Sequence, residues 1–132
     1  MQSFAVRTQK HTELLDITRQ VQDAASALGL RSGVLTVFVP HTTAAVTINE
    51  NADPDVASDI AAALERAVPW RAEYRHSEGN AAAHVKASLV GSSVQVLVEG
   101  GRLQLGTWQA VYFCEFDGPR SRKVWVAAAP SE

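Results

Sequence analysis

The chain has 132 residues, of which 46% are hydrophobic and 20% charged, and its formal net charge at pH 7 is −2. This length and composition fit one folded domain and exclude extensive disorder. The small net charge provides no general attraction to nucleic acid or to an anionic membrane. The N-terminus has no signal-peptide pattern, and no apolar run approaches the ~18 residues needed to span a bilayer. We therefore expect a single cytoplasmic domain over residues 1–132.

The first part of the chain has two strand patterns followed by a helix pattern. Apolar residues alternate in 2–8 and 12–17, which predicts an opening pair of strands. The helix should be capped by Asp16 or Thr18, and Gly29 supplies the residue that most easily adopts φ > 0 at a helix end. The apolar positions of this helix are Val21, Ala24, Ala25 and Leu28.

Two further strands and a well-marked helix should follow. The strands are expected at 33–39, a run rich in β-branched residues, and at 43–49. In the helix, Asp53 can cap the N-terminus, Pro54 occupies the first helical position, and Pro69 ends the pattern. The apolar stripe of this helix comprises Val56, Ile60, Leu64 and Ala67.

The remainder of the chain contains one short helix and mostly strands. The helix should run from near Asn80 to Gly91. From Ser92 onward, strand patterns alternate with turn signals at the glycine pair 100–101 and at DGPR, residues 117–120. Strand runs outnumber helical ones and do not alternate regularly with them. We therefore expect an α+β fold with a mixed or antiparallel sheet and two to three helices. The single cysteine, Cys114, has apolar neighbours and should be a small buried residue.

Three of the four histidines lie in two segments that have polar neighbours. His41 follows Pro40 between two predicted strands, His76 lies in an irregular segment, and His84 lies in the short helix. Neutral imidazole is a common metal ligand, and three of them can leave a fourth position open for water or substrate. The sequence has neither HExxH nor a paired CxxC, however. The three histidines are therefore either a metal site or ordinary hydrogen-bonded residues of loops and core.

Carboxylates near these histidines are candidates to orient an imidazole or to act as a base. Glu50 follows the first histidine segment, and Glu78 lies between the other two histidines. Helix capping already explains Asp53 and Asp55. Glu50 and Glu78 are therefore the candidate catalytic carboxylates.

Hydroxyl, amide and basic groups in the same segments can bind phosphate or another oxyanion. Thr42 and Thr43 supply hydroxyls and backbone N–H groups, and Asn80 lies at the expected start of a helix. An alternative interpretation of equal weight is that the threonines are ordinary strand residues and that the asparagine caps a helix. Arg120 and Arg122 are further candidates for phosphate binding, although a charged hairpin turn explains them as well.

Three motifs occur in this order in the chain: PHTTAAVTINENADPDV, GNAAAHVKASLVG and GGRLQLGTWQAVYFCEFDGPRSRKV. With these motifs the chain resembles, from about Thr8 to Val126, the YjbQ-like family, which is also labelled secondary thiamine-phosphate synthase. The resemblance implies a compact fold with a β-sandwich, a homotrimer with its sheets around a three-fold axis, and a site at a subunit boundary. That site would gather the three histidines around a divalent metal (zinc or magnesium) or an anion, with Thr42, Asn80, Trp108 and Gln109 lining it.

The implied activity joins hydroxymethylpyrimidine diphosphate to a thiazole phosphate and expels pyrophosphate. Lys86, Arg120 and Arg122 are candidates to neutralise the leaving pyrophosphate, together with a metal. The dedicated synthase is a (β/α)₈ barrel of around 250 residues, which this chain cannot form, so the activity would be a secondary one. Two alternatives stay open: a metal-dependent hydrolase of a phosphorylated or acyl metabolite, with Glu50 or Glu78 as base, and a non-enzymatic metabolite- or metal-binding module.

Overall fold

The computed structural model describes residues 1–131, which form eight strands and three helices. The strands are β1 (Gln2–Arg7), β2 (Glu13–Asp16), β3 (Ser32–Phe38), β4 (Ala44–Glu50), β5 (Ser93–Glu99), β6 (Arg102–Leu103), β7 (Gln109–Glu115) and β8 (Ser121–Pro130). The helices are α1 (Thr18–Ala27), α2 (Pro54–Ala67) and α3 (Ala81–Val90). None of these helices has the length and apolar character that crossing a bilayer requires.

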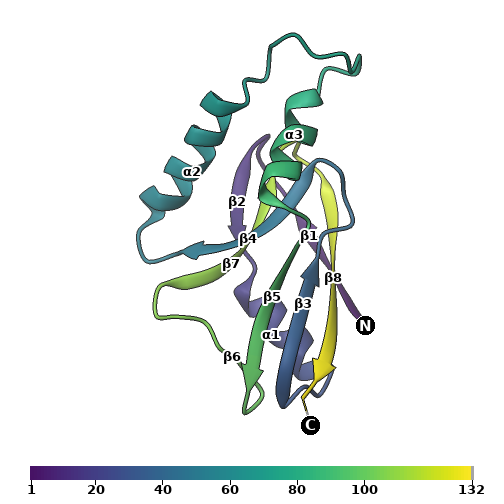
Figure 1. Ribbon diagram of the computed structural model, residues 1–132, viewed down its shortest axis with the longest axis vertical. Coiled ribbons are helices and arrows are strands. Elements are labelled where there is room, and N and C mark those ends of the chain that lie inside the picture. Colours follow the sequence, from purple (N-terminus) through teal and green to yellow (C-terminus); the bar gives the residue numbers. More distant parts are fainter. Residues whose placement is uncertain (132) are drawn as a thin grey trace.

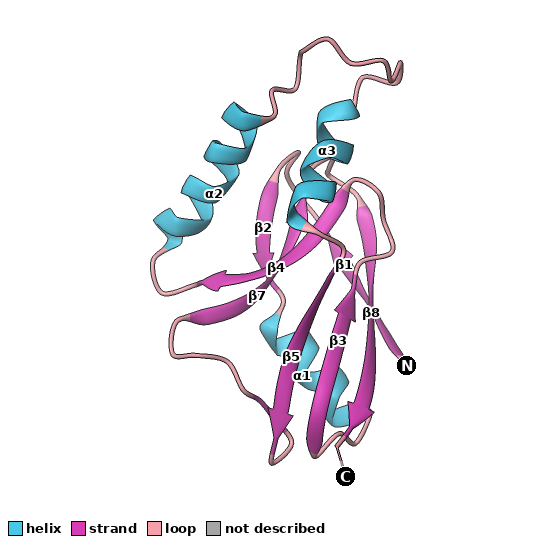
Figure 2. Cartoon of the chain, in the orientation of Figure 1, coloured by secondary structure: helices cyan, strands magenta, loops and turns pink. Residues whose placement is uncertain are grey.

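The strands form two sheets, and every pairing among residues 1–131 is antiparallel (Figure 2). The larger sheet has the order β1-β8-β3-β5-β6 and the smaller one β2-β7-β4. This arrangement confirms the expected α+β class. The expected opening strand pair is wrong, however, because β1 pairs with β8 and β2 pairs with β7. Alternating apolar residues identify a strand and its buried face, but they do not identify the neighbouring strand.

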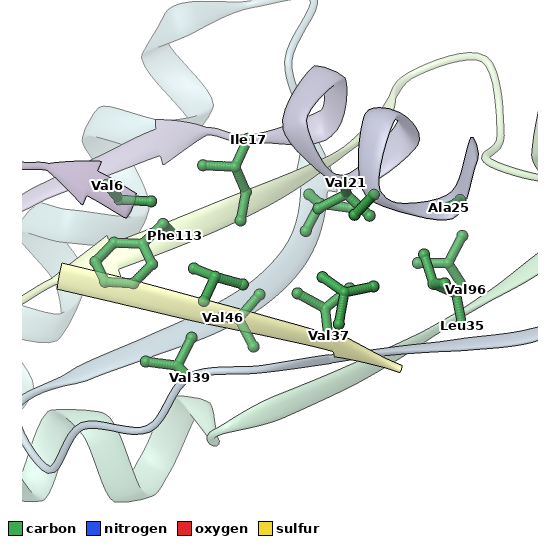
Figure 3. Close-up of a cluster of buried hydrophobic side chains, with 14 of the residues drawn as sticks. Val6, Ile17, Val21, Ala25, Leu35, Val37, Val39, Val46, Val96 and Phe113 are labelled. Atoms are coloured by element: carbon green, nitrogen blue, oxygen red, sulfur yellow. The ribbon is translucent and has the colours of Figure 1, made fainter. Parts of the chain in front are cut away.

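The main hydrophobic core lies between the two sheets, with α1 packed against it (Figure 3). Both sheets contribute their inward-facing residues, and the alternation of buried and exposed positions along β5 and β8 reflects the two-residue period of a strand. Truncating a large side chain at such a site costs about 3–5 kcal/mol of stability. Fully buried members of this core include Val21, Ala25, Leu35, Val37, Val46 and Phe113.

A smaller cluster covers the outer face of the smaller sheet. Ala83 and Ala87 of α3 pack there with Ala45 of β4 and with Phe116. Cys114 belongs to this cluster and is 1% exposed, which confirms the expected burial. Burial raises the pKa of the Cys114 thiol to about 12, so this cysteine is a packing residue and not a nucleophile.

The start of α2 and the end of α1 follow the sequence signals, whereas Ile17 before α1 and Asn80 before α3 make no side-chain cap. Asp53 accepts a hydrogen bond from the backbone N–H of Asp55 at 2.9 Å, and Pro54 begins α2. Asp16 accepts one from the N–H of Thr18 at 2.9 Å at the start of α1. Gly29, just beyond α1, has φ of 68°, as its position predicts.

Helix α2 stands at one side of the molecule, and a long connection leads from it to α3 (Figure 1). None of the α2 residues is buried. Leu64 from its apolar stripe reaches the smaller cluster, and Glu65 forms an ion pair with the fully buried Lys86 of α3. This helix is therefore attached loosely to the body, by its approach to β2 and β4 and by the contacts of Leu64 and Glu65.

The chain passes between the two sheets several times, and two of these crossings lie side by side. One of the two leads from β3 to β4, at residues 39–43, and the other leads from β7 to β8, at residues 116–120. The N–H of Phe116 donates to the carbonyl of Thr43 at 3.2 Å, which joins the crossings directly. The topology thereby brings together two motif segments that are far apart in the sequence.

Candidate functional site

A cleft opens where the two crossings meet the beginning of α3. One chamber, of about 390 Å³, holds eight of the thirteen predicted site residues. A second chamber, of about 480 Å³, extends along α3 and shares His41, Thr42 and His84 with the first. We call the two chambers together the crossing cleft. The first chamber is lined by Pro40, His41, Thr42, Thr43, Glu78, Asn80, His84, Arg120 and Arg122.

His41 is held by a backbone group of β8. The N–H of Lys123 donates to Nε2 of His41 at 2.9 Å. The neutral ring must therefore carry its proton on Nδ1, which makes Nδ1–H a hydrogen-bond donor. Burial, and next the positive charge of Arg122, lower the pKa of His41 below its usual value. His41 is thus a neutral donor at pH 7, and a metal could use Nε2 only by displacing the bond from Lys123.

A buried ion pair lies directly behind the cleft. Arg122 is 5% exposed and Glu115 is fully buried. Nε of Arg122 donates to Glu115 at 2.9 Å, and Nη2 donates to the other oxygen of the same carboxylate. Nη2 also donates to the hydroxyl of Thr43 at 2.9 Å. Burial alone would raise the pKa of Glu115, but the hydrogen bonds from Arg122, Asp117 N–H and Thr8 hold it below its usual value.

A second, more exposed carboxylate organises the rim of the cleft. Asp117 accepts a hydrogen bond from Nη2 of Arg120 and another from Nδ2 of Asn80, both at 2.9 Å. The bond from Nδ2 fixes the orientation of the Asn80 amide, because a carboxylate can only accept. Oδ1 of Asn80 is the one buried side-chain polar atom without a hydrogen-bond partner in residues 1–131. Asn80 makes no side-chain cap on α3, so the expected capping role is not what holds its amide in place.

The three predicted histidine ligands come near one another without forming a complete metal site. The rings of His76 and His84 are in edge contact, with centroids 5.1 Å apart. His41 and His84 line the same chambers, whereas His76 lines neither. Within residues 1–131, no three His, Cys, Asp or Glu side chains are placed to share a metal ion. The metal site stays a prediction.

Four other predicted site residues lie away from the crossing cleft. Lys86 is fully buried beneath α2, where it bonds Glu65. Glu50 lies at the end of β4 remote from His41, roughly 20 Å along a seven-residue strand. Gln109 pairs with Glu50 across the sheet, and Trp108, which precedes β7 instead of lying in it, is 61% exposed. Within one chain, the predicted lining residues therefore fall into two groups at opposite ends of β4.

The sequence-based prediction missed Glu115, Asp117 and Thr8, which orient the residues of the cleft. One signal was available for the buried pair. Arg122 has the same parity along β8 as Val124, which is buried, so a core-facing guanidinium should have prompted a search for an acidic partner. No comparable pattern marks Asp117 or Thr8, whose roles depend on how the turn between β7 and β8 packs against the start of the chain.

The groups that face the cleft are mostly hydrogen-bond donors. Among the lining residues, neutral His41 can donate from Nδ1, Thr42 from its hydroxyl, and Arg120 and Arg122 from their guanidinium groups. Such a set suits an oxyanion with several oxygens, since each oxygen can accept more than one hydrogen bond. Of the two candidate catalytic carboxylates, only Glu78 lines the cleft.

Known proteins resemble this chain over nearly its whole length. The model of the family described as UPF0047 protein YjbQ-like matches residues 2–131. The UPF0047 protein YugU of Bacillus subtilis is 50% identical over 127 residues, which are 96% of this chain and 96% of that protein. A solved structure of an uncharacterized YjbQ/UPF0047 protein from Clostridium acetobutylicum is 50% identical, covers 98% of this chain and 100% of its own, and has a TM-score of 0.95. A hypothetical protein from Aeropyrum pernix is 39% identical, with 98% of both chains covered and a TM-score of 0.93.

Proposed function

Because the chain belongs to the UPF0047 YjbQ-like family, we propose that it is a small enzyme with secondary thiamine-phosphate synthase activity, whose crossing cleft binds the diphosphate of the substrate. One observation carries this function: His41, Thr42 and two arginines converge as donors on a chamber of about 390 Å³. A diphosphate offers the oxygens that such donors need. Because Arg120 is already paired with Asp117 and Arg122 with Glu115, the two guanidinium groups act as oriented donors and a further cation would balance the charge of the diphosphate.

In the proposed reaction, the nitrogen of the thiazole phosphate attacks the methylene carbon of hydroxymethylpyrimidine diphosphate. The new C–N bond forms as the C–O bond to the diphosphate breaks, and the electron pair leaves with pyrophosphate. Negative charge therefore grows on the leaving group in the transition state. Nδ1–H of His41 and the guanidinium groups of Arg120 and Arg122 would stabilise that charge, because they are oriented before the substrate arrives.

A divalent metal, magnesium or zinc, is part of the proposal as an aid to neutralising the diphosphate. His76 and His84 would be the ligands within one chain, since their rings are in contact. Two imidazoles do not complete a shell, so further ligands would come from the substrate or from another copy of the chain. The steps above depend only on the donors of the cleft.

We also propose that three copies assemble through the outer face of the larger sheet. Phe38 of β3 and Trp125 of β8 stack there with ring centroids 5.9 Å apart, and Leu97 of β5 is 63% exposed. An exposed apolar face of this kind is typical of a protein–protein interface. Assembly would also give Trp108 and Gln109 a route to the cleft of a neighbouring copy. Light scattering should report three times the 14.2 kDa of one chain, and a monomer would contradict this assembly.

The test of the function is formation of thiamine phosphate from the two precursors by protein purified from cells that lack the dedicated synthase. His41→Ala and Arg120→Ala should each lower the rate about a hundredfold or more, the scale for one oriented donor. Trp70→Phe, a substitution outside the cleft, is the control and should keep the rate. Full activity in both cleft variants would contradict the site, and no activity in the wild type would contradict the reaction.

The edge contact of His76 and His84 also favours a second candidate, a metal-dependent hydrolase with Glu78 as base. Metal analysis of untagged protein grown with ample zinc and magnesium separates the two. Stoichiometric tightly bound metal that is lost in His84→Ala, together with hydrolysis of a phosphorylated metabolite, would favour the hydrolase. Tight binding of metabolites without any turnover would instead favour a non-enzymatic binding module.

A further inference from the structure

Glu115 lies behind the wall of the crossing cleft and holds that wall in place. Its carboxylate accepts hydrogen bonds from Nε and Nη2 of Arg122, from the hydroxyl of Thr8 at 2.8 Å and from the N–H of Asp117 at 3.0 Å. Four donors around one buried carboxylate leave Glu115 no freedom to rotate. The carboxylate itself does not line either chamber.

The way in which Arg122 is held leaves part of it unused. Nε and Nη2 are bound to Glu115 and to Thr43, whereas Nη1 has no acceptor within residues 1–131. Nη1 is also not a buried orphan, because the one such atom in the described chain belongs to Asn80. Since Arg122 lines the chamber, Nη1 is the edge of the guanidinium that a ligand can reach.

We infer that Glu115 is the positioning residue of the crossing cleft, fixing the guanidinium of Arg122 so that Nη1 points its two N–H groups at a ligand oxyanion. This inference rests on the proposed function, in which Arg122 is one of the groups that bind the diphosphate. A planar guanidinium clamped along one edge keeps its other edge in a fixed direction, which an ammonium group cannot do. Glu115 therefore contributes to binding without touching the ligand.

The same clamp sets the loop that carries the remaining donors. Nη2 of Arg122 donates to the hydroxyl of Thr43 at 2.9 Å and to its carbonyl at 3.3 Å. Thr43 directly follows His41 and Thr42 in the sequence, so the position of Arg122 is transmitted to both. Loss of the Glu115 carboxylate would therefore disturb the wall and the loop together.

The test uses inorganic pyrophosphate as the probe, in calorimetric titrations of the whole protein. Glu115→Gln should weaken binding at least about tenfold, the scale of one hydrogen bond to a charged group. Glu65→Gln is the matched control, because it also removes the charged partner of a buried cation, Lys86, but lies outside the cleft. Both variants should lose stability, whereas only Glu115→Gln should lose affinity.

A second variant keeps the test informative if Glu115→Gln does not fold. Arg122→Lys retains the charge and its partner but cannot offer two oriented edges, so it too should bind pyrophosphate about tenfold more weakly or worse. In the wild type, the ¹⁵Nε resonance of Arg122 should shift when pyrophosphate is added. Wild-type affinity in Glu115→Gln, or in Arg122→Lys, would overturn the positioning role and leave the proposed function intact. Absence of pyrophosphate binding by the wild type would overturn both.

Discussion

Gly118, in the turn between β7 and β8, occupies a space that no other residue can fill. A Cβ at this position would lie 2.8 Å from Cγ of Glu115 and 2.9 Å from the hydroxyl oxygen of Thr8, and closer still to the carbonyl oxygen of Lys10. Ordinary contacts of a carbon atom are ~3.5–4.0 Å. The N–H of Gly118 also donates to the carbonyl of His11 at 3.0 Å, so the turn cannot move away without losing a hydrogen bond.

We predict that Gly118→Ala destabilises the protein by about 3 kcal/mol. Overpacking of this kind costs about 1–3 kcal/mol, and the lost hydrogen bond adds about 0.5–1.5 kcal/mol. With an unfolding entropy of about 2.1 cal/mol/K per residue, a 132-residue chain should melt about 10 °C lower. Calorimetry at one fixed protein concentration measures the shift, since assembly would make Tm concentration-dependent.

The control for this experiment is Gly79→Ala. Gly79 has φ of +86°, and a Cβ there would meet nothing within 4 Å. Gly79→Ala should therefore lose stability through backbone strain alone, by roughly 1–2 kcal/mol. If Gly118→Ala lowered Tm no more than Gly79→Ala, the close approach of the turn to Lys10 would not be a constraint in solution, and the packing described for the rear of the cleft would be wrong.

Three further predictions follow from burial and charge. Cys114, whose pKa burial raises to about 12, should react with a thiol reagent at pH 8 only after unfolding, and fast labelling of the native protein would contradict its burial. Because the pKa of His41 is lowered in the folded state, the unfolded chain takes up that proton more readily, so stability should fall as pH drops below about 6.5 and level off below the folded pKa. In urea unfolding, the stability of His41→Gln should fall less with decreasing pH than that of the wild type. An equal or steeper fall would show that the pKa of His41 is not lowered by folding. In the same assay, the free energy of unfolding of Lys86→Met should stay within about 1 kcal/mol of the wild-type value, whereas that of Glu65→Ala should fall by about 3 kcal/mol or more. The reason is that only Glu65→Ala leaves a buried charge, that of Lys86, without its partner. Equal losses in the two variants would contradict this reasoning.

The sequence predicted those parts of the fold that depend on local chemistry. Asp53 followed by Pro54 places the start of α2 correctly because capping and a fixed φ act within one turn. Gly91, at the end of α3, has φ of 105° for the same kind of local reason. The pairing of β1 with β8 was not predictable in this way, because it depends on contacts between opposite ends of the chain.

The sequence predicted many of the residues of the candidate site, but it did not predict how they are arranged in space. His41 and Arg122 were candidates from their residue types and their neighbours, but spacing in sequence could not show that the two sheet crossings bring them together. Glu115 was not recognised within β7, because its role depends on a contact with Arg122 of β8. Glu50 and Trp108 were grouped with the histidines, although β4 separates them from the cleft within one chain.

The most direct test of the central claim is a crystal structure of the protein grown with millimolar pyrophosphate. We predict density for the anion in the crossing cleft, with its oxygens within hydrogen-bond distance of Nδ1 of His41, the hydroxyl of Thr42 and Nη1 of Arg122. An empty cleft at saturating pyrophosphate, or the anion bound only elsewhere on the surface, would contradict the assignment of this cleft as the diphosphate site.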